Sequence, residues 1–243
     1  MGESTKISFC DSTINPVIGC DLRCELYPDI CYAAKLAKRF AGRPGWPIDF
    51  LHPEYFPGRL EKSQLWSRWP DRIGKSHLYH LPRIIFLGDM ADIYSKSAPP
   101  TGVWLHPFIY GLNLRHFYLI LTKRPSAAVK DKAVLNHPRF FVGTSITTQE
   151  TIRRAEIMEE EAQRYWLSIE PMMGEINISG LNPGWVVVGS QLGVKQDIAW
   201  VRKIRDYCEA NHIPFFFKQW GDEREPSLDG VIYHQMPEIT CAR

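Results

Sequence analysis

Six short runs of apolar residues recur along the chain, and each is followed by a more polar stretch. The runs are nearly continuous rather than alternating, which is typical of strands that are covered on both faces. Residues 5–18 can supply one more strand at the start of the series. The six runs occupy residues 83–88, 117–122, 140–144, 165–169, 185–189 and 214–218.

Helical patterns lie between these runs. Residues 148–163 are rich in Glu, Arg and Ala, and residues 198–211 carry apolar residues at near-helical spacing. A further helix is expected over residues 32–40, because Gly42 and Pro44 follow it. Alternating strands and helices predict parallel pairing with right-handed crossovers, and therefore an α/β fold. Periodicity alone leaves open a doubly wound sheet and a partial or full parallel β/α barrel.

The rhythm of the pattern also suggests the domain organisation. A chain of 243 residues, 44% of them hydrophobic, fits one β/α barrel over residues 1–221. Residues 43–82 interrupt the rhythm with prolines and three tryptophans, as expected of a lid or of short helices. The tryptophans either line a substrate lid or stack a base, or they pack in the core or the lid, which is the more common fate. Residues 222–243 are expected to form an irregular tail.

Charge and hydropathy limit the class of protein. The net charge is +2, which indicates neither a disordered tail nor a dedicated nucleic-acid binder, although it leaves such a partner open. No apolar stretch approaches the roughly 20 residues of a membrane helix. No signal-peptide pattern opens the chain. We therefore expect a cytoplasmic protein with no membrane partner.

Three of the six cysteines lie close together, as Cys20, Cys24 and Cys31 in a C-x₃-C-x₆-C pattern. They follow an expected strand and precede an expected helix, so a short loop can bring their sulfurs together. Thiolates bind soft metals, and three ligands leave a position open for chemistry. An iron–sulfur cluster held in this way keeps one iron free. The remaining cysteines, assigned to packing or to the tail, are Cys10, Cys208 and Cys241.

Two other interpretations of these thiols stay open. One is a zinc site that is completed by a remote histidine, His52 or His80, in a zinc-stabilised nucleic-acid-binding module. The other is a set of buried thiols with no ligand.

The cysteine loop resembles the cluster loop of radical-SAM enzymes, although their usual spacing is C-x₃-C-x₂-C. Over residues 6–221 the chain also resembles a phage-associated family of unknown function, grouped near radical-SAM and spore-photoproduct-lyase-like proteins. The motifs that carry this resemblance lie at residues 11–16, 51–54, 86–92, 121–125, 169–174 and 216–221. The family's usual Gly-Gly-Glu is Gly189-Ser190-Gln191 here, so one carboxylate is missing.

The resemblance implies a radical-SAM-like TIM-type barrel and two cofactors, a 4Fe-4S cluster and S-adenosyl-L-methionine. Reduction of the cluster would cleave the methionine sulfonium and yield a 5′-deoxyadenosyl radical. Parallel strands bind ligands at their carboxyl ends, where polar residues follow several strands here. The residues expected at the cluster are Cys20, Cys24 and Cys31. Those expected at the cofactor are Tyr32, Gly88, Asp89, Met90, Lys123, Thr144, Ser145, Glu170 and Gln191.

Other side chains are expected to support this site. Asn15 is extended because it precedes Pro16, and it can brace the cysteine loop. Arg23 either offsets the charge of the cluster or is solvated. The implied partners are a small-molecule or nucleotide substrate, with a nucleobase as one option, and an electron donor such as flavodoxin or ferredoxin. A catalytically inert scaffold that still binds a cluster is also open.

Overall fold

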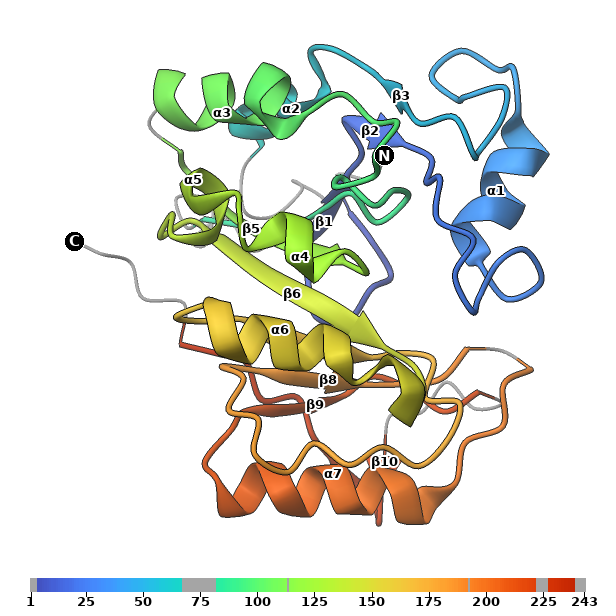
Figure 1. The fold of residues 1–243 in the computed structure, drawn as a ribbon, viewed down its shortest axis with the longest axis vertical. Helices are drawn as coiled ribbons and strands as arrows, with labels where there is room; N and C mark the ends of the chain where they lie inside the picture. The colour runs from blue at the N-terminus through green and yellow to red at the C-terminus, as the bar shows by residue number, and fades with distance from the viewer. Residues whose placement is uncertain (1–3, 67–81, 113, 192, 222–226, 239–243) are drawn as a thin grey trace, which may run out of the picture. The chain divides into compact units, whose positions relative to one another are not determined.

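The structure, a computed structural model, describes residues 4–66, 82–112, 114–191, 193–221 and 227–238 (Figure 1). The chain forms two compact units, Met1–Arg124 and Pro125–Arg243. None of the described helices has the length and apolar character needed to cross a membrane.

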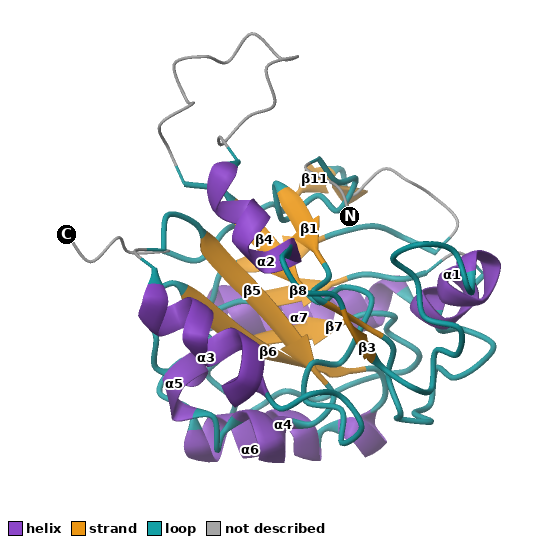
Figure 2. Ribbon diagram, turned by 90° about the horizontal axis from the view of Figure 1, so that it is seen from above, coloured by secondary structure: helices purple, strands orange, loops and turns teal. Residues whose placement is uncertain are grey.

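The first unit contains a parallel sheet in which β4 lies between β1 and β5 (Figure 2). Ile14 pairs with Leu87, and Leu87 pairs with Ile120, so the strands end at nearly the same level. The residues that follow β1 and β4 therefore share one edge of the sheet. The strands are β1 (Ser12–Ile14), β4 (Ile84–Leu87) and β5 (Phe117–Thr122).

One short strand and two short helical turns lie in the described part of the proline- and tryptophan-rich segment, for which either a lid or short helices were expected. A small antiparallel pair, β2 with β3, precedes two short helical turns. These elements are β2 (Val17–Ile18), β3 (Glu54–Tyr55), α2 (Arg59–Lys62) and the 3₁₀ turn η1 (Ser63–Leu65). Trp69 and the rest of residues 67–81 lie outside the described residues.

Helix α1 (Tyr32–Phe40) has the bounds that the sequence predicts. The Cys31 sulfur accepts a hydrogen bond from the backbone N–H of Ala34 and caps the first turn. Alanines form its buried face, and lysines and arginines its exposed face. Gly42 follows with a φ of +73°, a conformation that glycine adopts without steric cost and that ends the helix.

Helix α3 (Thr101–Gly111) was not expected from the pattern. Its hydrophobic residues do not form one stripe, and Pro107 lies inside it, so the sequence lacks a clean helical period. Trp104 and Phe108 are nevertheless buried. The Phe108 ring meets the Tyr118 ring of β5 edge to face at 5.8 Å, which joins the helix to the sheet.

The second unit contains four parallel strands in chain order, and all four were predicted. Ile169 pairs with Val188, and Val188 pairs with Phe217, so these strands also end at one level. The strands are β6 (Phe140–Ile146), β7 (Trp166–Ile169), β8 (Val186–Val188) and β9 (Phe215–Phe217).

Helices connect these strands. Helix α7 (Ile198–Ala210) agrees with the prediction. Helix α6 (Arg153–Glu161) is shorter than predicted, because the 3₁₀ turn η4 (Gln149–Thr151) takes its first residues. Two short helices precede β6, namely α4 (Pro125–Ala128) and α5 (Lys132–Leu135).

The tail differs from the irregular segment that we expected. It contains a short antiparallel hairpin, β10 (Ser227–Leu228) with β11 (Val231–Ile232), that turns at Gly230. Leu228 is fully buried in the core of the second unit. Burial of this apolar side chain therefore helps to hold the hairpin against the second unit.

The core of the second unit lies between one face of its sheet and α7. Val188, Phe217 and the helix residues Ile204 and Cys208 all belong to it. Burial raises the pKa of Cys208 to about 12, so this thiol stays protonated, as expected of a packing residue. Both units consist of parallel strands with helical connections, and the predicted α/β class is confirmed. Cys241 lies outside the described residues.

Candidate functional site

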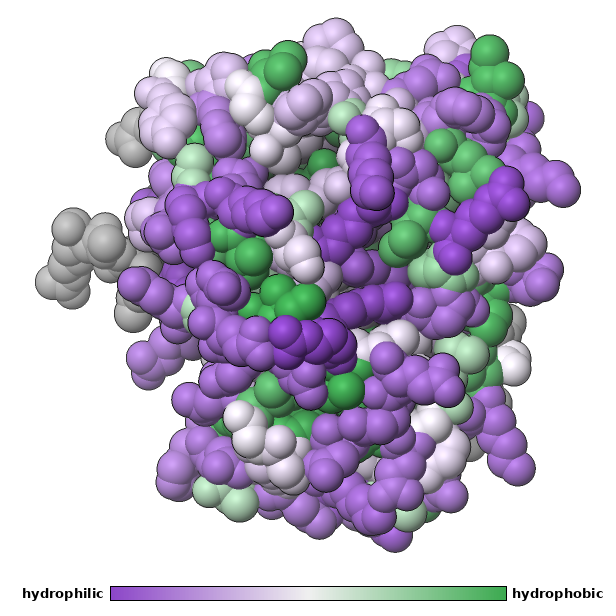
Figure 3. All heavy atoms as spheres, viewed as in Figure 1, coloured by the Kyte–Doolittle hydropathy of each residue, from purple (hydrophilic) through white to green (hydrophobic). Residues whose placement is uncertain are grey.

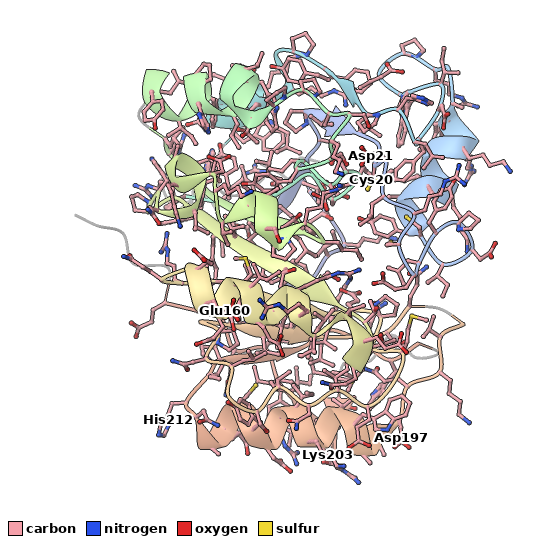
Figure 4. The ribbon with its side chains drawn as sticks, in the orientation of Figure 1. Cys20, Asp21, Glu160, Asp197, Lys203 and His212 are labelled. Atoms are coloured by element: carbon pink, nitrogen blue, oxygen red, sulfur yellow. The ribbon has the colours of Figure 1, made fainter. Side chains whose placement is uncertain are left out.

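The three clustered cysteines lie on the loop that leads from β2 to α1 in the first unit. Cys20, Cys24 and Cys31 are free thiols, and each is half-buried. Figure 4 shows Cys20 beside Asp21 on this loop. Half-buried thiols can reach a ligand and keep protein donors around them, as metal-binding sulfurs require.

Backbone contacts fix the start of the loop. The N–H of Gly19 donates to the Met90 carbonyl at 3.1 Å, and that of Cys20 donates to the Phe50 carbonyl at 2.8 Å. Gly19 has a φ of +116°, and a Cβ there would lie 2.8 Å from the Phe50 oxygen and from the Pro53 Cα. Only glycine fits this close approach, which sets the position of the first cysteine.

Asp21 ties the loop to the segments that follow β4 and β5. Its carboxylate accepts hydrogen bonds from the N–H and hydroxyl of Ser97, at 2.9 and 2.6 Å. Its other oxygen forms an ion pair with Arg124. Partial burial raises the pKa of Asp21, but the Ser97 bonds and the Arg124 charge outweigh burial, and the pKa is lowered.

The loop thiols lie in a partly desolvated environment. Burial raises the pKa of Cys20, and the charge of Asp92 raises it further. Burial also raises the pKa of Cys31, while the charge of Lys123 lowers it. The charge of Cys24 also raises the pKa of Cys31. Without a cation Cys20 and Cys31 favour their protonated form, so ligation of a metal by these two thiols would release protons.

Two buried polar atoms near Cys20 have no hydrogen-bond partner among the described residues. They are the Ser95 hydroxyl oxygen and the Arg124 Nε. The Ser95 hydroxyl and the charge of Arg124 both act to lower the pKa of Cys20, against the effect of burial. Buried donors without partners are costly, so a ligand that reached these two atoms would gain hydrogen bonds.

Asn15 was expected to brace the cysteine loop, but its side chain holds the loop after β4, at Asp89 and Met90. Its side-chain nitrogen donates to the Asp89 carboxylate at 2.6 Å, and its oxygen accepts from the Met90 N–H at 2.9 Å. The Tyr32 hydroxyl donates to the Asp89 carbonyl. Burial raises the pKa of Asp89, although the Asn15 bond opposes this. Four of the predicted cofactor residues therefore come together in the first unit, since Gly88 precedes Asp89.

Asp92 organises the end of β5. Its carboxylate accepts from the Thr122 hydroxyl at 2.8 Å and from the Lys123 N–H at 2.9 Å. The Thr122 oxygen in turn accepts from the Arg124 N–H at 2.8 Å. These bonds place Lys123 and Arg124 beside the cysteine loop, which brings a fifth predicted cofactor residue to the same region.

The other predicted cofactor residues lie in the second unit, where two strand ends form a polar edge. Glu170 follows β7, Lys218 follows β9, and the two form an ion pair. Gly189 follows β8 between them, and a Cβ there would lie 3.2 Å from that of Lys218. The glycine thus leaves the space in which the ion pair forms.

Polar side chains next to this edge are mostly occupied by backbone contacts. The Ser190 hydroxyl donates to the Val194 carbonyl at 2.7 Å, and the Gln219 amide donates to the Ser190 carbonyl at 2.9 Å. Thr144 and Ser145 are buried in β6, and the Ser145 hydroxyl has no partner among the described residues. Gln191 is half-buried.

Sequence reasoning missed Asp21, Asp92, Ser95 and Arg124 as parts of the site. Asp92 and Arg124 stand inside motifs that the resemblance used, and Asp21 adjoins Cys20. Charged residues directly after a strand, or within a cysteine loop, were therefore the available signal. Ser95 gave none, because a lone serine in a turn is common.

The donor set fits a soft metal group, with three thiols on one loop, two cations and two buried donors beside them. Within the described ranges no three His, Cys, Asp or Glu side chains are gathered as ligands of a single ion. In a cluster each thiolate binds its own iron, so its sulfurs need not surround one point. Of the two histidines considered for zinc, His52 is exposed and bonds to Asp49 at 2.8 Å, and His80 lies outside the described residues.

The chain is therefore an α/β protein in which a loop with three cysteines adjoins the segment that follows β4 in the first unit. A family model described as "Protein of unknown function (DUF5131)" matches residues 4–237, so the chain belongs to this family. No curated protein and no solved structure matches the chain.

Proposed function

We propose that this protein is a radical S-adenosylmethionine enzyme that holds a 4Fe-4S cluster through Cys20, Cys24 and Cys31. The observation that carries the proposal is the cysteine loop, with three free, half-buried thiols and, nearby, buried donors that have no partner among the described residues. The chemistry such a cluster supplies is one-electron cleavage of the sulfonium of S-adenosylmethionine, which gives a 5′-deoxyadenosyl radical.

The residues around the loop have distinct roles in this proposal. Lys123 and Arg124 offset the negative charge of thiolate ligands, and the Ser95 hydroxyl donates to sulfur. Asp21 holds Arg124 in place and fixes the loop against Ser97. These residues favour bound thiolates, whereas burial alone favours thiols.

In this proposal Asp89 and the backbone around it receive the amino group of the cofactor. Asn15 holds the carboxylate, and Tyr32 holds the carbonyl. Gly88 has a φ of +83°, which turns the chain sharply after β4.

The remaining parts of the proposal rest on the resemblance. They are a β/α barrel, cofactor contacts from Thr144, Ser145, Glu170 and Gln191, a cytoplasmic location, and an electron donor such as flavodoxin or ferredoxin. The substrate class is a nucleobase or nucleotide.

Anaerobic reconstitution with ferrous iron and sulfide tests the cluster. The wild-type chain is expected to take up both and to absorb at about 400 nm through thiolate-to-iron charge transfer. The variants Cys20→Ser, Cys24→Ser and Cys31→Ser should each lose most of the iron, whereas Cys10→Ser should keep it. Iron retained in any loop variant would show that the ligands are wrong.

Reduction of the loaded protein with S-adenosylmethionine tests the enzyme. We expect 5′-deoxyadenosine in the product and a changed electron paramagnetic resonance spectrum when the cofactor is added. A cluster without this product would indicate an inert scaffold. A colourless protein with one tightly bound zinc ion would support the zinc-stabilised module instead.

A further inference from the structure

Positive charge is concentrated on α1 and the turn that follows it. Residues 32–43 carry four cations and no carboxylate. The whole chain has a net charge of +2, so without these four cations the rest would have −2. The low net charge therefore hides a basic face, defined here as Lys35, Lys38, Arg39 and Arg43.

The side chains of the basic face are exposed to solvent. All four residues are exposed, and within the part of the chain that the structure describes none of them pairs with a carboxylate. Both views place α1 at the outer edge of the first unit (Figures 1 and 2). Figure 3 shows strongly hydrophilic side chains beside hydrophobic ones in the region of α1.

Aromatic rings lie between these cations. The guanidinium groups of Arg39 and Arg43 lie 5.5 and 5.2 Å from the centre of the Phe40 ring. The Phe40 ring packs against that of Trp46 at 4.8 Å, and both residues are half-buried. These contacts hold two planar guanidiniums next to partly accessible aromatic surface.

We propose that the basic face binds a single strand of nucleic acid through its phosphates. Lys35 and Arg39 are one helical turn apart, about 6 Å along the axis, which is the rise of roughly two stacked nucleotides. Arginine forks bind phosphate oxygens in pairs. Aromatic and guanidinium planes stack unpaired bases, which a duplex does not offer. An acidic protein partner would pair with the four cations but would not need the aromatic rings for stacking.

The proposal adds a partner to the proposed function and does not depend on the cluster. Cys31 caps α1, so a strand on the basic face lies next to the cysteine loop. Such a strand would be presented to the chemistry proposed there.

Fluorescence anisotropy with a labelled deoxythymidine 20-mer tests the proposal on the full chain. The test variant is K35Q/K38Q/R39Q/R43Q. A matched variant, K62Q/K96Q/K130Q/K195Q, removes the same charge from exposed lysines elsewhere. At about 0.1 M salt we expect the test variant to bind at least about tenfold more weakly. The slope of log K against log salt should fall in magnitude by about 2–3, since each lost phosphate contact contributes about 0.7.

Equal losses in the two variants, or no loss in the test variant, would overturn the proposal. A polyglutamate peptide of the same charge that competes as well as the oligonucleotide would also overturn it, in favour of an acidic protein partner. Equal thermal unfolding midpoints of the two variants exclude misfolding as the cause. Measurements with and without iron keep the two proposals separate, because strand binding is expected in both states.

Discussion

Asp21 is one position from the first loop cysteine, and its carboxylate makes three contacts with two other residues. It receives two hydrogen bonds from Ser97 and an ion pair from Arg124. Both partners of the ion pair are mostly buried, with 15% and 20% of their side chains exposed. Loss of the negative charge would leave a desolvated guanidinium, which costs more than the pair itself contributes.

Asp21→Asn is therefore expected to lower the free energy of unfolding by about 1–2 kcal/mol, since the carboxylate keeps some solvent contact. It should also reduce iron retention after reconstitution. Urea unfolding and iron analysis measure these effects. Asp229→Asn is the matched control, because Asp229 pairs with Arg202 at a more exposed site of the second unit. An equal loss in both variants would contradict a special role for Asp21.

The pKa shift of Asp21 also fixes the direction of its pH dependence. Because the pKa is lowered in the fold, its stabilising effect is present above the ordinary carboxyl pKa and is lost as the pH falls through the folded value.

His116 gives a separate pH prediction, which does not involve the cysteines. Its ring is fully buried, its Nδ1 accepts the Arg83 N–H at 3.0 Å, and burial lowers its pKa to about 4. Between pH 6.5 and about 4 only the unfolded chain binds this proton, so stability is expected to fall with pH over this window. Below about pH 4 the total loss in the free energy of unfolding approaches about 3 kcal/mol.

The comparison variant for this test is His116→Asn, which keeps an acceptor for Arg83 but does not titrate. Urea unfolding from pH 7 to pH 4 should show a shallower decrease in the variant than in the wild type. Parallel curves would mean that His116 is protonated in the folded protein.

Gly19 shows how the backbone near β2 sets the position of the cysteine loop. Gly19→Ala would place a methyl group 2.8 Å from the Phe50 oxygen, at a φ of +116°. Gly42→Ala would place a methyl group at a backbone φ of +73° but would meet no atom within 4 Å. We expect a loss of about 2–4 kcal/mol for the first and about 1 kcal/mol for the second.

The two glycine variants also separate stability from ligand binding. Gly19→Ala should lower iron uptake, because Cys20 must move with it, whereas Gly42→Ala should not. Urea unfolding and iron analysis on both proteins measure the difference. Normal iron uptake by Gly19→Ala would show that the loop adapts without its close contact to Phe50.

Strands and amphipathic helices were predictable because their signals are local. The buried strands read as apolar runs, and α1 and α7 have clean faces and stops. Helix α3 was not predictable, since Trp104 and Phe108 are buried by contacts distant in the chain. The hairpin after residue 226 depends on the burial of Leu228, which its own segment does not reveal.

The spacing of the three cysteines predicts that one loop carries them, and the structure places them on one loop. Their surroundings were not predictable, because Asp21 meets Ser97 and Arg124 only through the fold. Asn15 was predicted as a brace from its place before Pro16, yet its partner Asp89 came from another strand end. Asn15 meets Asp89 because β1 and β4, which these residues follow, are paired in the sheet.

All three proposed cluster ligands lie in the first of the two units. Residues 20–31 and 88–97, together with Lys123 and Arg124, belong to the first unit. Uptake of iron and sulfide should therefore reduce amide exchange in those two segments, because a metal that binds only the folded loop suppresses its opening. Amides of α7, in the second unit, should exchange at unchanged rates.

Hydrogen exchange followed by mass spectrometry, before and after anaerobic reconstitution, measures this pattern. Cys24→Ser is the control, since it keeps the loop length and removes one ligand, and it should show no protection. The midpoint of thermal unfolding should rise with iron for the wild type alone. Iron uptake without protection of residues 20–31 would place the metal elsewhere. Protection of α7 alone would assign iron binding to the second unit, where the described residues offer only the buried Cys208 as a thiol.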